Sequence, residues 1–142
     1  MKITYGTIDI LMQAFGRMGT LTGKVGYAIV RSKHNLQKEF EIYSEMRNNL
    51  IRKYADEGSN GIKPGDKNFP AFVKEYAELQ NKEIEADLHQ IDKADYDIDA
   101  VYCETAQAQD YDLIEAFLVK EDDPDDAQSS TGTGKAADKE SE

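Results

Sequence analysis

Residues 24–54 decide the fold, and they read KVGYAIVRSKHNLQKEFEIYSEMRNNLIRKY. Apolar and aromatic side chains recur here at helical spacings, and a stripe of this period buries one face of a helix against a partner. The stretch predicts one helix of about 46 Å, at about 1.5 Å per residue. A helix of that length either contacts most of the domain or reaches a second subunit. Its expected buried positions are Ile29, Leu36, Phe40, Tyr43, Leu50 and Tyr54.

A first, shorter helix is expected before this stretch. Residues 2–5 favour a short β-strand, Gly6 ends it, and Thr7 is the predicted N-cap of a helix. Glycines then punctuate the chain, and Thr22 can cap the long helix that follows. The two helices should therefore form an αα-hairpin. The apolar face of the first helix consists of Ile8, Leu11, Met12, Phe15 and Met18.

Two more helices are expected after the long one. Residues 56–65 are rich in Gly, Asp, Asn and Pro and form the main internal loop. A third helix begins near Asn68, because Pro70 suits a first helical turn. A short amphipathic helix or an apolar C-terminal segment follows Asp110.

Two short segments alternate apolar and polar residues and favour β-strands. Residues 84–89 alternate over three steps, although the third helix could instead continue through them, and residues 97–103 begin with a similar alternation. The expected fold is mainly α, with three to four helices, one long central helix and a small β-hairpin or sheet, and α+β is the alternative class. Residues 1–120 should form one α-rich domain. Residues 121–142 are acidic and rich in Ser, Thr and Gly, so we expect a disordered tail.

Charge is distributed unevenly along the chain, whose formal net charge is −11. Residues 1–74 hold twelve Lys and Arg against seven Asp and Glu, a net charge of +5. Residues 75–120 hold three against thirteen, a net charge of −10, and the tail carries a further −6. The acidic C-terminal part is unsuited to non-specific binding of nucleic acid or anionic membranes. We therefore expect no direct nucleic-acid binding and no membrane association.

Cysteine and histidine usage argues against several kinds of site. Cys103 is the only cysteine, so an intramolecular disulfide is excluded, and a buried free thiol is expected. No charged-then-apolar leader opens the sequence, and a cytoplasmic protein is the simplest expectation. His34 and His89 lack partners at zinc-ligand spacing and are expected on the surface. The sequence predicts no metal, no cofactor and no enzymatic activity.

The acidic segment offers one candidate binding surface. Asp95, Asp97 and Asp99 match the first ligands of a calcium loop, but Ala100 and Ala106 replace its Gly and its bidentate Glu. An extended chain would instead align alternate carboxylates for a basic protein partner, although a merely solvated face explains the same residues. The candidate partner-binding residues are Glu83, Glu85, Asp87, Asp95, Asp97 and Asp99.

The long helix offers a second candidate. Arg31, Lys33 and Lys38, with Tyr27 nearby, could line a groove for a phosphate-bearing ligand. Glutamates interleave with the basic residues of this helix, and such mixing is also typical of an ordinary solvated face. Both interpretations remain open at the level of sequence.

The opening MKITYG, residues 48–57 (NNLIRKYADE), the Gly/Asn loop and residues 72–79 (FVKEYAEL) form a layout that extends over residues 1–119 and excludes the acidic tail. This layout resembles that of small proteins encoded by phages and prophages of Gram-positive bacteria. The resemblance implies a helical, non-catalytic, protein-binding module in the bacterial cytoplasm. We expect an acidic inhibitor of a host defence or nucleic-acid enzyme, of the anti-defence type. The alternatives are a phage assembly or accessory protein, oligomeric through the long helix, and a binder of a phosphate-bearing small ligand.

Overall fold

The computed structural model describes residues 1–56, 58–59, 61–99 and 103–120. Over these residues the chain is mainly helical with small sheets, which confirms the predicted fold class. The predicted tail at 121–142 lies outside the described residues. In chain order the elements are β1 (Lys2–Thr4), α1 (Tyr5–Arg17), α2 (Gly23–Tyr54), α3 (Phe69–Gln80), β2 (Glu83–Glu85), β3 (Ile91–Asp92), α4 (Lys93–Asp99), α5 (Ala108–Leu118) and β4 (Val119–Lys120).

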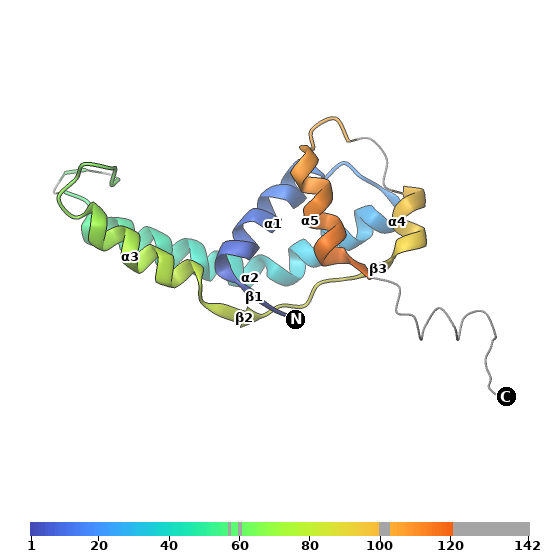
Figure 1. Cartoon of the computed structure of the whole chain (residues 1–142), viewed down its shortest axis with the longest axis horizontal. Helices are drawn as coiled ribbons and strands as arrows, with labels where there is room; N and C mark the ends of the chain where they lie inside the picture. Colours follow the sequence, from blue (N-terminus) through green and yellow to red (C-terminus); the bar gives the residue numbers. More distant parts are fainter. Residues whose placement is uncertain (57, 60, 100–102, 121–142) are drawn as a thin grey trace.

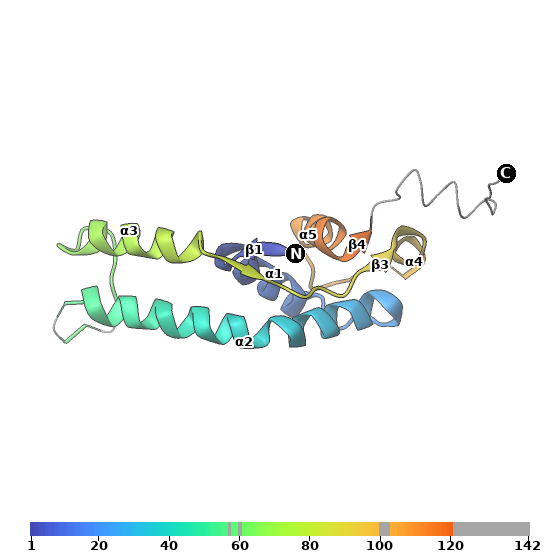
Figure 2. The same ribbon diagram turned by 90° about the horizontal axis from the view of Figure 1, so that it is seen from below.

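The long helix α2 runs through the whole molecule (Figures 1 and 2). Its N-terminal half lies with α1, α4 and α5 in a part that we call the head. Its C-terminal half pairs with α3 in a two-helix arm that projects from the head. The predicted buried stripe of α2 faces inward, since Leu36 and Tyr43 are buried and Phe40 packs on the core.

Helix α1 begins earlier than the sequence predicts. Thr4 is the N-cap, and its hydroxyl accepts a hydrogen bond from the backbone N–H of Thr7 at 3.1 Å. Thr7 is therefore the third helical residue, and its prediction as the cap is wrong. Thr4 is the N-cap because it is also the last residue of β1, and the helix starts directly after the strand. The predicted apolar face of α1 is buried.

The turn between α1 and α2 depends on a glycine. Leu21 crosses so close to Gly26 that a Cβ atom there would lie 2.3 Å from the Leu21 carbonyl oxygen. The Gly26 N–H bonds the carbonyl of Thr22 at 3.1 Å, and Thr22 is the N-cap of α2, as expected. The Thr22 side chain makes no capping hydrogen bond, so the close backbone packing of Leu21 on Gly26 defines this turn.

A series of aromatic rings joins the head to the arm. Tyr5 of α1 stacks on Tyr43 of α2 with ring centroids 5.7 Å apart, and Tyr43 stacks on Tyr76 of α3 at 6.4 Å. Phe72 and Phe69 continue the series along α3, with centroid distances of 5.5 and 6.3 Å. The hydroxyls of Tyr43 and Tyr76 lie 2.7 Å apart. The predicted start of α3 is confirmed, with Pro70 in its first turn.

The two sheets connect distant parts of the chain. Strand β1 pairs antiparallel with β2, so that Ile3 lies opposite Ile84, which confirms a strand near residue 84. Strand β3 pairs parallel with β4, so that Ile91 lies opposite Val119. Residues 86–90 have no regular secondary structure, although Ala86 is buried.

The strand predicted over residues 97–103 is wrong for residues 97–99. These residues end α4, in which Tyr96 is buried and Ile98 is 74% exposed. Burial of the large Tyr96 ring on the core outweighs the apolar and polar alternation of its neighbours. Residues 100–102, the middle of the predicted strand, lie outside the described residues.

Candidate functional site

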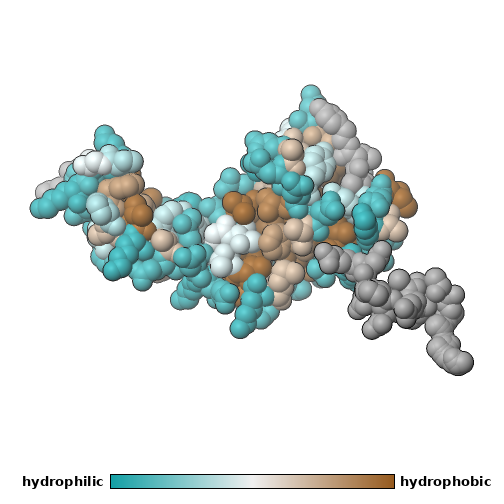
Figure 3. All heavy atoms as spheres, viewed as in Figure 1, coloured by the Kyte–Doolittle hydropathy of each residue, from teal (hydrophilic) through white to brown (hydrophobic). Residues whose placement is uncertain are grey.

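Helices α1 and α5 form a groove on the surface of the head, which we call the α1–α5 groove. Ile10, which is 47% exposed, and the half-buried Leu113 supply its apolar part. The groove has a volume of about 440 Å³ and is also lined by Gln13, Arg17, Gln107 and Gln109. Figure 3 shows apolar atoms gathered on the surface between α1 and α5. Apolar side chains here thus lie beside uncharged polar groups that can donate or accept hydrogen bonds.

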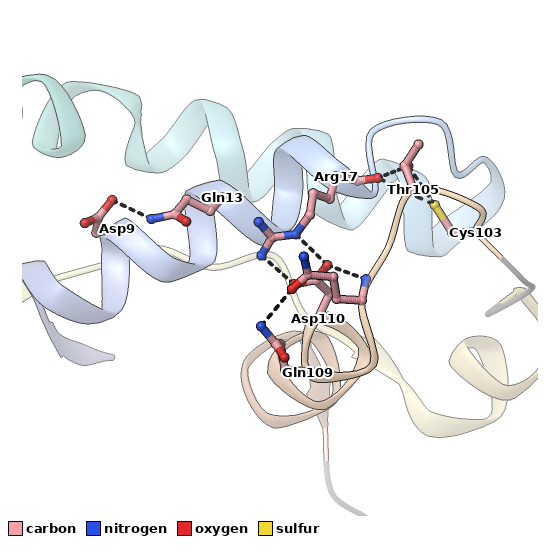
Figure 4. A network of polar contacts seen from close by, with 8 residues as sticks. Asp9, Gln13, Arg17, Cys103, Thr105, Gln109 and Asp110 are labelled. Carbon is pink, nitrogen blue, oxygen red and sulfur yellow. Dashed lines mark hydrogen bonds and ion pairs between the residues drawn. The ribbon is translucent and has the colours of Figure 1, made fainter.

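An ion pair ties the two walls of this groove together (Figure 4). Arg17 of α1 donates to both carboxylate oxygens of Asp110 in α5, at 2.8 and 2.7 Å. The backbone N–H of Gln107 donates to the same carboxylate at 2.8 Å, which closes the first turn of α5. Asp110 is fully buried, and the guanidinium of Arg17 holds the pKa of this carboxyl below its usual value. The ion pair therefore links α1 to α5 beside the groove.

The buried thiol of Cys103 lies at one end of this contact, as the sequence predicts for a buried cysteine. Its sulfur is 3.6 Å from the carbonyl oxygen of Arg17 and 3.5 and 3.7 Å from the hydroxyls of Thr105 and Thr20. Hydrogen bonding, led by Thr105, lowers the pKa of the thiol. None of these neighbours is a general base, so the contacts support a structural thiol.

Acidic side chains gather on the other flank of α5, in a group that we call the acidic cluster. Asp112 and Glu115 of α5 and Asp97 of α4 are exposed, and the negative charge of each acts on the hydroxyl of the buried Tyr96. Burial raises the pKa of the Tyr96 hydroxyl, and the negative charges of these three groups add to that effect. Helix α5 thus has an apolar groove on one flank and concentrated negative charge on the other.

The structure divides the six predicted acidic residues between two places. Glu83, Glu85 and Asp87 are exposed on and just after β2. Glu85 pairs with the N-terminal amine at 2.8 Å, and Asn35 donates to the backbone and side chain of Asp87.

The other predicted acidic residues lie on α4, so the expected alignment along an extended chain is wrong. Side chains two positions apart on a helix point in nearly opposite directions. Asp95 accordingly pairs with Lys24 at 3.1 Å, while Asp97 pairs with Lys93 at 3.3 Å and belongs to the acidic cluster. Asp99 ends α4, and its side chain lies outside the described residues.

The three predicted anion-binding residues do not share one depression. Arg31, Lys33 and Lys38 are all exposed on α2. Lys33 lines a depression of about 400 Å³ against α1, and Arg31 lines another of about 330 Å³ on the outer side of α2. Lys38 lines neither. A phosphate clamp built from all three is therefore not supported.

The two histidines lie near the same part of α2. His34 is exposed, as predicted, whereas His89 is half-buried with its ring edge-on to Tyr27 at 5.0 Å. Among the described residues, no group of three or more His, Cys, Asp or Glu side chains is placed to hold a metal ion.

Sequence reasoning missed the α1–α5 groove and the acidic residues of α5. One signal was available, because Gln107 and Asp110 have the spacing of a helix capping box, which marks where α5 begins. No local pattern pairs Arg17 with a carboxylate 93 positions away. The exposure of Ile10 was equally hard to predict, because apolar residues close to it in the sequence form the buried face of α1.

Comparisons with protein-family models, with curated proteins and with solved structures find no match for this chain. The resemblance to phage proteins therefore stays a prediction. No described helix combines the length and the apolar content needed to cross a bilayer.

Proposed function

We propose that this chain acts by binding another protein, without catalysis, and that the partner docks on α5. The observation that carries this proposal is the pair of surfaces on the two flanks of α5. The α1–α5 groove presents Ile10 and Leu113, and the acidic cluster presents Asp97, Asp112 and Glu115. A partner that presents apolar and basic side chains together would match both the α1–α5 groove and the acidic cluster.

The groove has the composition of a recognition surface. Apolar side chains lie beside glutamines, and protein interfaces likewise have an apolar centre and a polar rim. An amphipathic helix is a common occupant of a groove between two helices. The Arg17–Asp110 ion pair keeps the two walls together, so little ordering is needed when a partner binds.

The charge around the groove selects the kind of partner. Asp97, Asp112 and Glu115 are exposed and negative. Residues 121–142, which lie outside the described residues, add a net charge of −6 to the chain. Such negative charge accelerates association with a basic protein surface. Basic surfaces are typical of proteins that bind nucleic acid, and an inhibitor that occupies such a surface fits the predicted anti-defence role.

Affinity purification from host cells, with matched variants in parallel, tests the proposal. Ile10→Asp should abolish capture of the partner, whereas Val73→Asp, at a 44% exposed position on the arm, should leave it unchanged. Asp112→Lys with Glu115→Lys should weaken capture strongly at low salt, while reversal of the exposed Glu78 and Glu83 should not. Nucleic acid added to the captured partner should compete with the chain. Equal capture by all four variants would refute docking on α5.

A second candidate function is that of a phage assembly or accessory protein, oligomeric through α2. The observation that favours it is the uncovered outer side of this 32-residue helix (Figure 2). Fractionation of an infected culture separates the two functions. An assembly protein follows particles or their precursors, and an inhibitor follows its soluble target.

A further inference from the structure

The side of α2 that faces away from the core is exposed along the whole helix. Tyr27 and Val30 are exposed near its start, and Glu41 and Glu45 are exposed further along at helical spacing from them. In Figure 2 this helix forms one edge of the molecule, and the other labelled elements lie on its opposite side. We call this side the outer face of α2.

The outer face contains a depression of the kind that receives a side chain from another helix. It measures about 330 Å³ and is lined by Tyr27, Val30, Arg31, His34 and Asn35. The first four of these residues follow the i, i+3, i+4, i+7 spacing of the hole in knobs-into-holes packing. The exposed rings and aliphatic groups of Tyr27 and Val30 give this hole apolar walls.

Most charges along the outer face are separated by sign. Its first half carries the exposed basic residues Arg31 and Lys38 together with His34, and its second half carries the exposed Glu41 and Glu45, followed by the exposed Arg52 seven positions after Glu45. In the part of the chain that the structure describes, Arg31, Lys38 and Glu45 form no ion pair. The middle of the face, from Arg31 to Glu45, is therefore the electrostatic complement of a copy of itself turned end to end.

We propose that two copies of this chain pair antiparallel through the outer face of α2. In the register that places Lys38 of each copy opposite Glu41 of the other, His34 lies opposite Glu45 and Arg31 lies opposite Asn48. Two-fold symmetry repeats each pair. The axis then crosses near the middle of Gly23–Tyr54, so about 30 residues of each helix overlap, over about 45 Å.

The same charges disfavour other occupants. A parallel pair of helices would place Arg31 and Lys38 against their own copies, and like charges repel at helix seams. A uniformly basic or uniformly acidic partner would meet repulsion over one half of the face. A closed two-fold dimer uses both halves at once and leaves the α5 surface of each copy open to a different partner.

Sedimentation across a range of protein and salt concentrations tests the pairing. The wild-type chain should form dimers whose dissociation constant rises with ionic strength, because exposed charge pairs are screened by salt. Lys38→Glu replaces two attractive pairs by two repulsive ones and should raise that constant about tenfold. Lys33→Glu makes the same change of charge at an exposed position that faces α1, and it should leave the dimer intact.

A mixture of variants tests the register. Lys38→Glu and Glu41→Lys should each dimerise poorly alone, and an equimolar mixture should form a heterodimer, because each Glu then meets a Lys. His34→Glu, opposite Glu45, is an independent variant that should also weaken the dimer. Circular dichroism confirms that the variants stay helical.

Three results would overturn the inference. They are a wild-type chain that stays monomeric at every concentration, equal effects of Lys38→Glu and Lys33→Glu, and a mixture that fails to associate. Ile10→Asp should dimerise like wild type, which separates this interface from the α5 site.

Discussion

Replacing Asp110 by Ala should destabilise the fold more than any other change to an acidic residue of α5. The carboxylate is fully buried and accepts three hydrogen bonds, two from Arg17 and one from the backbone of Gln107. Removing one partner of a buried ion pair costs about 3–5 kcal/mol, and losing a helix cap costs about 1 kcal/mol. Arg17 is 31% exposed, so water can solvate its freed guanidinium, and the lower end of the range applies. We expect a loss of about 3 kcal/mol.

Thermal and urea unfolding, followed by circular dichroism at neutral pH, measures this loss. About 3 kcal/mol corresponds to a fall in melting temperature of about 12 °C for a domain of this size. Asp112→Ala is the matched control, because Asp112 is an exposed Asp on the same helix and its removal should change stability by less than about 0.5 kcal/mol. A loss below about 1 kcal/mol for Asp110→Ala would show that the ion pair does not hold α5 on α1.

The pH dependence of this difference follows from the lowered pKa of Asp110, whose largest cause is the hydrogen bond from Arg17. A lowered folded-state pKa contributes stability that is complete above the unfolded-state pKa of about 3.9, and that is lost as the pH falls through the folded-state pKa. The difference in unfolding free energy between wild type and Asp110→Ala should therefore become smaller at acidic pH. In Arg17→Leu the buried carboxylate lacks its cation, so its pKa should rise and this variant should gain stability as the pH falls. Parallel pH profiles for all three proteins would contradict the assignment.

Three further predictions concern the core. Leu36→Ala should cost about 3 kcal/mol in denaturant unfolding, because Leu36 is buried on the inner side of α2, whereas the exposed Ile42→Ala should cost less than about 1 kcal/mol. Gly26→Ala should destabilise by about 2 kcal/mol, because its Cβ would collide with the Leu21 carbonyl, whereas Gly16→Ala, with open space around it, should stabilise by about 0.8 kcal/mol. Burial, aided by Glu39, raises the pKa of Tyr5 to about 12. Because this exceeds the unfolded value of about 10, Tyr5 contributes stability below pH 10 that is lost as the pH rises toward 12, and Tyr5→Phe should flatten that part of an alkaline unfolding curve.

The sequence by itself determined α1, α2 and α3 and the mainly α class, because their signals are local. The period of α2, the glycines around residue 20 and Pro70 at the start of α3 each act within a few residues. The buried side of α2 was predictable for the same reason, since one stripe of apolar residues has one face to bury.

Only the tertiary structure decided which contacts the acidic residues make. Residues 93–99 alternate over too few steps for periodicity to separate a strand from one turn of helix, and burial of Tyr96 decides for the helix. That choice separates Asp95 from Asp97, and it lets Asp97 act on Tyr96 together with Asp112 and Glu115. The sequence predicts a helix after Asp110, but α5 begins at Ala108, and Arg17, 93 positions away, makes Asp110 a buried anchor in its first turn. Contacts between residues so far apart depend on how whole helices pack, and no local pattern of side chains encodes that packing.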